Sequence, residues 1–360
     1  MLTTIQMDYG QLKSFASEIM QAVGCDQKRA ALVAEVLVEA DARGIASHGV
    51  ARLWRYVNHI AQGLIDPAAL PHVVQESPLT VLLDGNAGVG QYIADVAMQK
   101  AISKAESTGV GFVAVRNSNH FGIAGYFAEK CVDQNMLGIA LTNTGPYVVP
   151  TFGKRPLMGT NPLALAFPTG DGFPVLVDMA TSVVPLGKLE TYARRKHSIP
   201  QGWAVDRLGH SATDPSDVIY QLKENALGGI LALGGEGEEF GGHKGFGLAL
   251  LIELLTAGLA QGSWSAETYR EVGGVCHFFG AVRLDLFGDP VAIRRHFTYI
   301  IEAIRASDKA EGAERIFIHG EKEYEARHRS LKEGVKLGEV TYQGLEELAR
   351  EFGVELVRRN

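Results

Sequence analysis

The chain reads Leu79-Thr80-Val81-Leu82-Leu83-Asp84-Gly85-Asn86-Ala87-Gly88-Val89-Gly90. The apolar first half of this stretch predicts a strand, and a helix is predicted from Gln91 to Ala105. The glycines between them follow the order G-x-x-G-x-G, whereas the dinucleotide fingerprint of a Rossmann fold requires G-x-G-x-x-G. We therefore interpret the turn as structural, although the amides that open the helix could still contact an anion. The stretch does not support a Rossmann domain.

Further strand-like and helical segments flank this turn. Short apolar runs predict strands at 111–115, 137–141, 164–168 and 174–178. Helical periodicity covers much of the first seventy residues and returns at 246–260, 290–306, 321–332 and 342–352. Residues 185–217 have weak periodicity and many turn residues, which is typical of a long excursion near a site. The pattern predicts an α/β or α+β fold, in which a helical lobe built from both chain ends flanks a sheet-containing middle.

Composition restricts the class of protein. A chain of 360 residues is too long for one small core, so two or more lobes are expected. A net charge of −7 gives no general attraction to nucleic acid or to an anionic membrane. The longest apolar run, 248–255, contains Glu253 and is too short to span a bilayer. We expect a soluble protein with neither a nucleic acid nor a membrane partner.

The cysteines and the N-terminus indicate the compartment. Cys25, Cys131 and Cys276 are odd in number and far apart in the sequence, so they form neither a disulfide framework nor a zinc ribbon. The first eight residues, MLTTIQMD, lack the basic and then apolar pattern of a signal peptide. Reduced structural thiols in a cytoplasmic protein are expected.

The first of two histidine motifs is Ala46-Ser47-His48-Gly49-Val50-Ala51-Arg52. On a helix, His48 and Arg52 would share one face. A guanidinium can bind a carboxylate through two parallel hydrogen bonds, and an imidazole can transfer a proton near neutral pH. A core or capping role for His48 and a surface ion pair for Arg52 are the alternatives. The spacing and the small polar neighbours favour a site.

The second motif places His120 among small polar residues, in Asn117-Ser118-Asn119-His120-Phe121-Gly122. Loops of this kind often carry reactive groups, but a structural histidine is equally consistent with the pattern. Because the sequence shows no metal-ligand spacing, the two histidines together indicate organic acid–base chemistry.

Glycine-rich and turn-rich segments are further candidates. Residues 234–247 are dense in glycine, and Lys244 is placed to pair with a phosphate at the start of a helix; a flexible hairpin is the alternative. The segments 159–162 and 178–182 follow apparent strands, where ligands gather, but their residue types also build turns unaided. Glu253, among leucines, is expected to pair with Arg or Lys or to lie at an interface.

In these motifs the chain resembles the malate/L-lactate dehydrogenase family of the non-Rossmann type, whose members include ureidoglycolate, sulfolactate and 2,3-diketogulonate dehydrogenases and piperideine-2-carboxylate reductase. The resemblance covers nearly the whole chain, with the motifs in the right order: Ser47-His48-Gly49-Val50, Gly88-x-Gly90-Gln91, Asn119-His120-Phe121-Gly122, Gly159-Thr160-Asn161-Pro162, Asp178-Met179-Ala180-Thr181-Ser182, Gly242-His243-Lys244-Gly245 and His319-Gly320-Glu321. It implies a homodimer and a non-Rossmann NAD(P)-binding domain with a largely antiparallel sheet. This domain would span 76–289, and residues 1–75 with 290–360 would form the helical, substrate-side domain.

The resemblance also implies the site residues. His48 and His120 correspond to histidines proposed as the acid–base group, and the choice between them stays open. Substrate contacts are implied for Ser47, Arg52 and Thr160. Cofactor contacts are implied for His120, Thr144, Asp178, Met179, Ala180, Thr181, Ser182, His243, Lys244, Gly245, His319, Gly320 and Glu321. The chain departs from the family pattern at Pro185 and Leu186, and at His319.

The reaction implied is reversible hydride transfer between NAD or NADP, with NAD preferred, and C2 of a small 2-hydroxy or 2-oxo acid. In reduction, Arg52 would hold the carboxylate while protonated His48 or His120 donates to the developing alkoxide. Two alternatives stay open. One is NADPH-dependent reduction of a cyclic imino acid. The other is a cofactor-free lyase or isomerase that uses the paired histidines for proton transfer.

Overall fold

In the computed structural model of the chain, residues 4–224, 226–270 and 272–358 are described. Their main feature is a seven-stranded sheet in the order β2-β3-β4-β11-β5-β7-β8. In that order the strands are β2 (His72–Glu76), β3 (Thr80–Asp84), β4 (Val110–Ser118), β11 (Val275–Arg283), β5 (Met136–Thr142), β7 (Leu163–Phe167) and β8 (Val175–Met179). β3 and β4 pair in parallel, and the other neighbouring pairs of this sheet are antiparallel. The expected α/β class with a largely antiparallel sheet is confirmed.

The glycine turn between β3 and α4 (Gly90–Thr108) lies against the chain that follows β4. A Cβ atom at Gly90 would lie only 2.3 Å from the carbonyl oxygen of Asn119. The side-chain amide of Asn119, in turn, donates to the carbonyl oxygen of Ala87 at 2.9 Å. The turn is structural, as expected, because its glycine allows the close approach that fixes the segment leading into His120.

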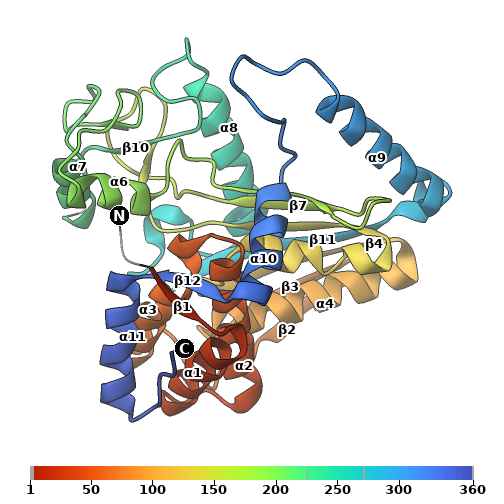
Figure 1. Ribbon diagram of the computed structural model, residues 1–360, viewed down its shortest axis with the longest axis horizontal. Helices are drawn as coiled ribbons and strands as arrows, with labels where there is room; N and C mark the ends of the chain where they lie inside the picture. Colours follow the sequence, from red (N-terminus) through yellow and green to blue (C-terminus); the bar gives the residue numbers. More distant parts are fainter. Residues whose placement is uncertain (1–3, 225, 271, 359–360) are drawn as a thin grey trace.

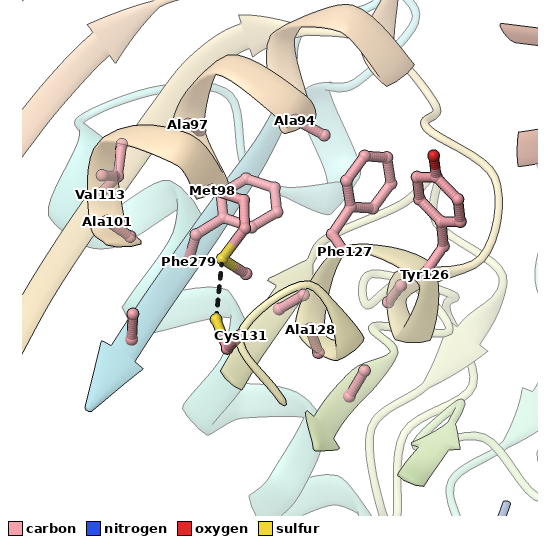
Figure 2. Close-up of a cluster of buried hydrophobic side chains, with 14 of the residues drawn as sticks. Ala94, Ala97, Met98, Ala101, Val113, Tyr126, Phe127, Ala128, Cys131 and Phe279 are labelled. Carbon is pink, nitrogen blue, oxygen red and sulfur yellow. Dashed lines mark hydrogen bonds between the residues drawn. The ribbon is translucent and has the colours of Figure 1, made fainter. Parts of the chain in front are cut away.

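One core lies between the large sheet and the helices α4 and α5 (Ala124–Glu129). Figure 2 shows alanines and Met98 of α4 together with Phe279 of β11 and Phe127 of α5. Small side chains on α4 bring the helix close to the sheet, and the rings fill the remaining volume. The Sγ atom of Cys131 lies 3.5 Å from the Met98 sulfur, and burial raises the pKa of this thiol to about 12. All three cysteines are free and buried, as expected of structural thiols.

Helices from both ends of the chain pack together beside this sheet (Figure 1). They are α1 (Tyr9–Ala22), α2 (Gln27–Ala42), α3 (Leu53–Ala61), α10 (Glu321–Glu333) and α11 (Glu339–Phe352), with an antiparallel pair of strands, β1 (Thr4–Met7) and β12 (Val335–Gly338). Leu37 of α2 and Leu345 of α11 belong to one shared core. α9 (Pro290–Arg305) instead packs Phe297 against Phe167 of β7. The domain boundaries given above stay a prediction.

A second, three-stranded sheet has the order β6-β10-β9. Its strands are β6 (Val148–Val149), β10 (Gly229–Leu231) and β9 (Ala204–Val205). Against it pack α6 (Leu186–Arg194), α7 (Pro215–Lys223) and α8 (Gly242–Glu253), and α8 continues into the π-helical η4 (Leu254–Gly258). Single turns of 3-10 helix are η1 (Ala46–His48), η2 (Val50–Arg52), η3 (Val132–Gln134), η5 (Ser265–Glu267) and η6 (Leu284–Leu286). The excursion expected at 185–217 therefore contains α6 and β9, whose shortness explains the weak periodicity.

The helices differ in how much apolar surface they expose: α8 and α9 carry exposed apolar side chains, whereas α4 buries its apolar face. α4, with 19 residues, turns one face to the sheet and exposes polar side chains on the other. Across the described ranges, no helix combines the length and the hydropathy needed to cross a membrane.

Candidate active site

A cavity of about 280 Å³ lies where the turn before α3 meets the loops that follow the strands of the large sheet. Phe121, Ile123 and Met179 contribute apolar wall. Of the residues predicted for the site, the cavity lining brings together Ser47, His48, His120, Thr144, Thr160, Asp178, Met179 and Ala180. The first and the last of these residues are more than one hundred positions apart in the sequence. The fold therefore brings together residues that the sequence shows only as separate motifs.

The segment that carries His48 is not a continuous α-helix. η1 and η2 are separated by Gly49, whose backbone is extended at φ −81° and ψ −158°. The physical reason is Asp41 of α2, whose buried carboxyl accepts the Val50 N–H at 2.7 Å. A Cβ atom at Gly49 would lie 2.0 Å from that carboxyl. The expectation that a helix presents His48 and Arg52 on one face is therefore wrong for this segment.

Arg52 lies beside the cavity and does not line it. Its Nε atom donates to the carbonyl oxygen of Ser47 at 2.7 Å, which ties the end of η2 back to η1. The Ser47 hydroxyl lies 2.9 Å from Nδ1 of His48. Arg52 therefore helps to fix the loop that presents Ser47 and His48, and its charge acts on His48.

His48 and His120 are neighbours in the structure, although their sequence motifs lie about seventy positions apart. The rings of His48 and His120 stack with centroids 5.6 Å apart and an interplanar angle of 20°. Burial, together with the charges of Arg52 and Arg55, lowers the pKa of His48 to about 4. Burial and the charge of Arg55 also hold the pKa of His120 well below its usual value. Both rings are neutral near pH 7, and an anion bound beside the arginines would raise both pKa values.

The Nδ1 atom of His120 accepts hydrogen bonds. The Gly122 N–H, which can only donate, points to it at 3.3 Å, and the Tyr56 hydroxyl lies 2.6 Å away. With the amide as a fixed donor, Nδ1 carries no proton, and the hydroxyl donates as well. The proton of the neutral ring therefore lies on Nε2, where it is available to a ligand in the cavity.

Three residues near this site were missed in the sequence. Tyr56 is buried and bonds His120, while Tyr269 lines the cavity. The guanidinium carbon of Arg55 lies 5.2 Å from the ring centroid of Tyr269. Arg55 follows Arg52 by three positions, a spacing that could have drawn attention to it. No motif or spacing around Tyr269 in the sequence indicates that it lies near the site.

The far wall of the cavity is formed by residues around β5, β7 and β8. The Thr144 hydroxyl accepts the Thr160 N–H at 2.9 Å, which joins the loop after β5 to the loop before β7. Asp178, at the end of β8, accepts the Gly125 N–H at 2.7 Å. Burial raises the pKa of Asp178 to about 6, although this hydrogen bond opposes the shift. Thr144, Thr160 and Asp178 thus line the same cavity as the two histidines.

Other residues expected at the site lie outside this lining: Arg52, Thr181, Ser182, His243, Lys244, Gly245, His319, Gly320 and Glu321. Thr181 is buried and donates to the carbonyl oxygen of Thr160 at 3.1 Å, so it supports the cavity wall from behind. His243 and Lys244 are exposed in the first turn of α8. Gly320 precedes α10 in the left-handed region, at φ +89°. Their expected contact with a cofactor stays a prediction.

Glu253 has a structural place in the fold. Its buried carboxylate accepts hydrogen bonds from the side-chain amides of Asn143 at 3.0 Å and Asn161 at 2.8 Å. It also accepts the backbone N–H of Ser265 at 2.8 Å. The expected Arg or Lys partner is wrong, because amides, a hydroxyl and a backbone N–H satisfy this carboxylate instead. In the part of the chain that is described, no cluster of three His, Cys, Asp or Glu side chains is arranged to hold a metal ion.

The chain is similar in sequence to known dehydrogenases and to a reductase. A family model described as malate/L-lactate dehydrogenase matches residues 7–346. The malate dehydrogenase of Pyrococcus horikoshii is 42% identical over 354 residues, covering 98% of this chain and 96% of that protein. The L-sulfolactate dehydrogenase of Methanocaldococcus jannaschii is 36% identical over 353 residues, covering 96% of each. The Δ1-pyrroline-2-carboxylate/Δ1-piperideine-2-carboxylate reductase of Pseudomonas putida is 31% identical over 348 residues, covering 96% and 97%.

Similarity extends to three-dimensional structure. The crystal structure of the malate dehydrogenase from Entamoeba histolytica matches this chain with a TM-score of 0.95 at 34% identity. The match covers 98% of this chain and 99% of that one. The similarity to this family in sequence and in fold therefore covers nearly the whole length of the chain.

Proposed function

The chain belongs to the malate/L-lactate dehydrogenase family, and on that premise we propose that it is an NAD(P)-dependent dehydrogenase of a small 2-hydroxy acid. The observation that carries the proposal is the stacked pair of His48 and His120 on one cavity, with the arginines Arg52 and Arg55 close by. A nicotinamide dinucleotide, when bound, supplies or accepts the hydride exchanged at C2 of the substrate. NAD is preferred over NADP in this proposal.

The residues present fit such a cofactor. The apolar wall around Phe121 and Met179 suits a planar ring, while Thr144 and Asp178 offer polar groups at its edge. We propose that Thr144, His120 and the stretch 178–180 hold the part of the cofactor nearest the histidines. Its other parts would be held by the remaining predicted residues, Thr181, Ser182, His243, Lys244, Gly245, His319, Gly320 and Glu321.

The protein's own groups bind the acid and move the proton. Ser47, Arg52 and Thr160 hold the substrate by its carboxylate and hydroxyl oxygens. In reduction, a histidine N–H gives its proton to the oxygen on C2; in oxidation, the same nitrogen takes it back. The free rings are neutral near pH 7, so the protonated donor expected from sequence has to form in the complex. The bound carboxylate offsets the arginine charges and raises the histidine pKa values, which makes this possible.

Reduction of a cyclic imino acid is a second candidate, favoured by the 31% identity to the Pseudomonas putida reductase. The same cavity would bind the ring carboxylate, and the histidine proton would go to nitrogen instead of oxygen. Assays with keto and imino acids in parallel separate the two reactions.

The test is the absorbance of reduced nicotinamide, with NADH and then NADPH, against a panel of 2-oxo acids and cyclic imino acids. We expect oxidation of at least one cofactor by a 2-oxo acid. The variants His48→Ala and His120→Ala identify the acid–base group. Loss of the histidine that transfers the proton should lower kcat far more than it lowers the affinity for the cofactor. His72→Ala, an exposed position on β2, is the matched control. Silence across the panel, with no cofactor binding by calorimetry, would refute the proposal.

We further infer a cytoplasmic homodimer. The exposed apolar side chains Leu250, Leu251, Leu254 and Leu259, which are 41–57% exposed on α8 and the turns after it, support a subunit interface. The buried free thiols support a reducing compartment. Light scattering of the purified protein measures the dimer directly, and a monomeric mass would refute it.

A further inference from the structure

The buried carboxylate of Glu253 joins two loops that line the cavity. One of its oxygens accepts the side-chain amide of Asn143 at 3.0 Å and the backbone N–H of Ser265 at 2.8 Å. The other accepts the side-chain amide of Asn161 at 2.8 Å and the Ser265 hydroxyl at 2.6 Å. These donors fill the acceptor capacity of one carboxylate, and they come from three separate segments of the chain.

Two of those segments contribute directly to the cavity lining. The first contributes residues 142–144, and the second contributes Thr160 and Pro162. Asn161, between the last two, is fully buried and turns its side-chain amide to Glu253 instead. The carboxylate therefore fixes the spacing between the loop 142–144 and the loop 160–162 from behind the cavity wall.

Asn161 needs this support because of its backbone conformation. Its φ is +33°, in the left-handed region, and it directly precedes Pro162. A residue other than glycine seldom adopts a positive φ, and a following proline favours extended backbone. Such a conformation persists only when the surrounding contacts hold it. The Asn161 amide makes two of these contacts, to Glu253 and to the carbonyl oxygen of Ala249 at 3.1 Å.

We propose that Glu253 is a positioning residue for substrate binding, which acts through Asn161 to place Thr160. The inference rests on the proposed function, in which Thr160 holds the acid. It adds to that function a buried group that controls the affinity for the acid without touching it.

Glu253→Gln should affect the two oxygens unequally, because an amide nitrogen cannot accept a hydrogen bond. On the Asn143 side both donors are fixed. The Ser265 N–H can only donate, and the Asn143 amide keeps its orientation because its Oδ1 accepts the Cys276 N–H at 2.8 Å. On the other side the Ser265 hydroxyl can turn, accept the new N–H and donate to Oδ1 of Asn161, which lies 3.3 Å away. The variant therefore releases the Asn161 amide and keeps the Asn143 contact.

The experiment measures kcat and KM with the 2-oxo acid of the panel, oxaloacetate included, that is reduced fastest. The dissociation constant of the cofactor, NADH or NADPH, is measured by calorimetry. In Glu253→Gln we expect KM for the acid to rise about 10-fold or more, because a hydrogen bond to a charged group no longer holds the loop 160–162. The kcat and the cofactor dissociation constant should change by a few-fold at most.

Glu39→Gln is the matched control. Glu39 is buried like Glu253, but it lies in α2 and pairs with Arg43 and Arg327. Its loss should lower the melting temperature and leave KM for the acid at the wild-type value. A rise of KM in Glu253→Gln is then not a general result of removing a buried carboxylate.

A double-mutant cycle tests whether the effect passes through Asn161. Asn161→Gly removes the amide and tolerates the positive φ, so it should raise KM by a similar factor. The double variant should be no worse than either single variant, because both changes remove the same contact. If Glu253→Gln does not fold, Asn161→Gly alone is compared with Glu39→Gln.

The possible failures are distinguishable. Additive rises of KM in the cycle, or a lower melting temperature with KM unchanged, overturn the role of Glu253 and leave the dehydrogenase intact. An equal loss of cofactor affinity does the same. Absence of nicotinamide oxidation with every acid refutes the dehydrogenase itself. Hydrogen exchange then still tests the contact, since the segment 159–163 should exchange faster in Glu253→Gln than in the wild type; unchanged exchange overturns it.

Discussion

His120 is held through Nδ1, and this contact decides what the ring can do. The Gly122 amide and the Tyr56 hydroxyl both reach that atom, which leaves the proton of the neutral ring on Nε2. The Nε2–H can hydrogen bond to the oxygen on C2 of a 2-oxo acid, and the ring donates a proton there once the bound carboxylate has raised its pKa enough for the ring to be protonated in the complex. Tyr56 therefore acts as a positioning residue for His120.

Tyr56→Phe tests this arrangement. The hydroxyl stabilises the neutral ring by donating to Nδ1, so its removal should raise the pKa of His120 toward the ordinary value. We expect kcat to fall about 10-fold or more with a smaller change in KM, because orientation is lost. The pH profile of kcat/KM, and ring resonances followed by NMR, measure the shift. A profile identical to that of the wild type would contradict the role.

At the same scale, sequence reasoning found His48 and His120 but not Arg55. The histidines stand in recognisable local motifs, whereas the place of Arg55 depends on Tyr269, which lies more than two hundred positions away in the chain. A contact of that kind leaves no trace in residue spacing. Arg52 is expected to hold the substrate carboxylate, and it lies at the end of η2, beside the residues that line the cavity.

Among the elements, the broken segment η1–η2 depends most clearly on a contact from a neighbouring helix, α2. Asp41 is buried in α2, and its accepted hydrogen bond from the Val50 N–H holds the segment that carries His48. Burial raises the pKa of Asp41 to about 7 from the ordinary value of 3.8. The position of the loop that carries His48 is thus tied to a carboxyl whose pKa is raised by burial.

Asp41→Asn should change how stability depends on pH. Between pH 4 and pH 7 the folded state retains a proton on Asp41 that the unfolded state has lost, so this carboxyl lowers stability as pH rises through that window. Asparagine keeps an acceptor for the Val50 N–H and removes the titration. From pH 5 to pH 7, the wild type should lose about 2–3 kcal/mol of unfolding free energy relative to the variant. Denaturant unfolding at both pH values measures this difference. If the wild type and the variant lose the same unfolding free energy from pH 5 to pH 7, the prediction is contradicted.

Most strands of the large sheet could be predicted because each is a short apolar run between turn residues. The strands of the small sheet could not, since β6 and β9 have two residues each and show no periodicity. The same limit applies to η1 and η2. Their shape follows from Asp41, and a helical reading of the local sequence misses it.

At the scale of the whole molecule, the cavity draws on all three packed regions. Ser47 and His48 come from the helices at the chain ends, His120 and Asp178 come from the large sheet, and Pro185 precedes α6 of the small-sheet region. Sequence periodicity could not predict this junction, because the cavity exists only once the three regions are packed.

In the proposed reaction, hydride leaves C2 of a hydroxy acid at this junction. The measurement is the fate of deuterium placed at C2 of the 2-hydroxy acid identified in the panel, with the oxidised cofactor present. We expect the label to appear in the reduced nicotinamide and turnover to show a primary isotope effect. Release of the label to water, with turnover independent of cofactor, would contradict it and indicate a lyase or isomerase that moves a proton between the two histidines.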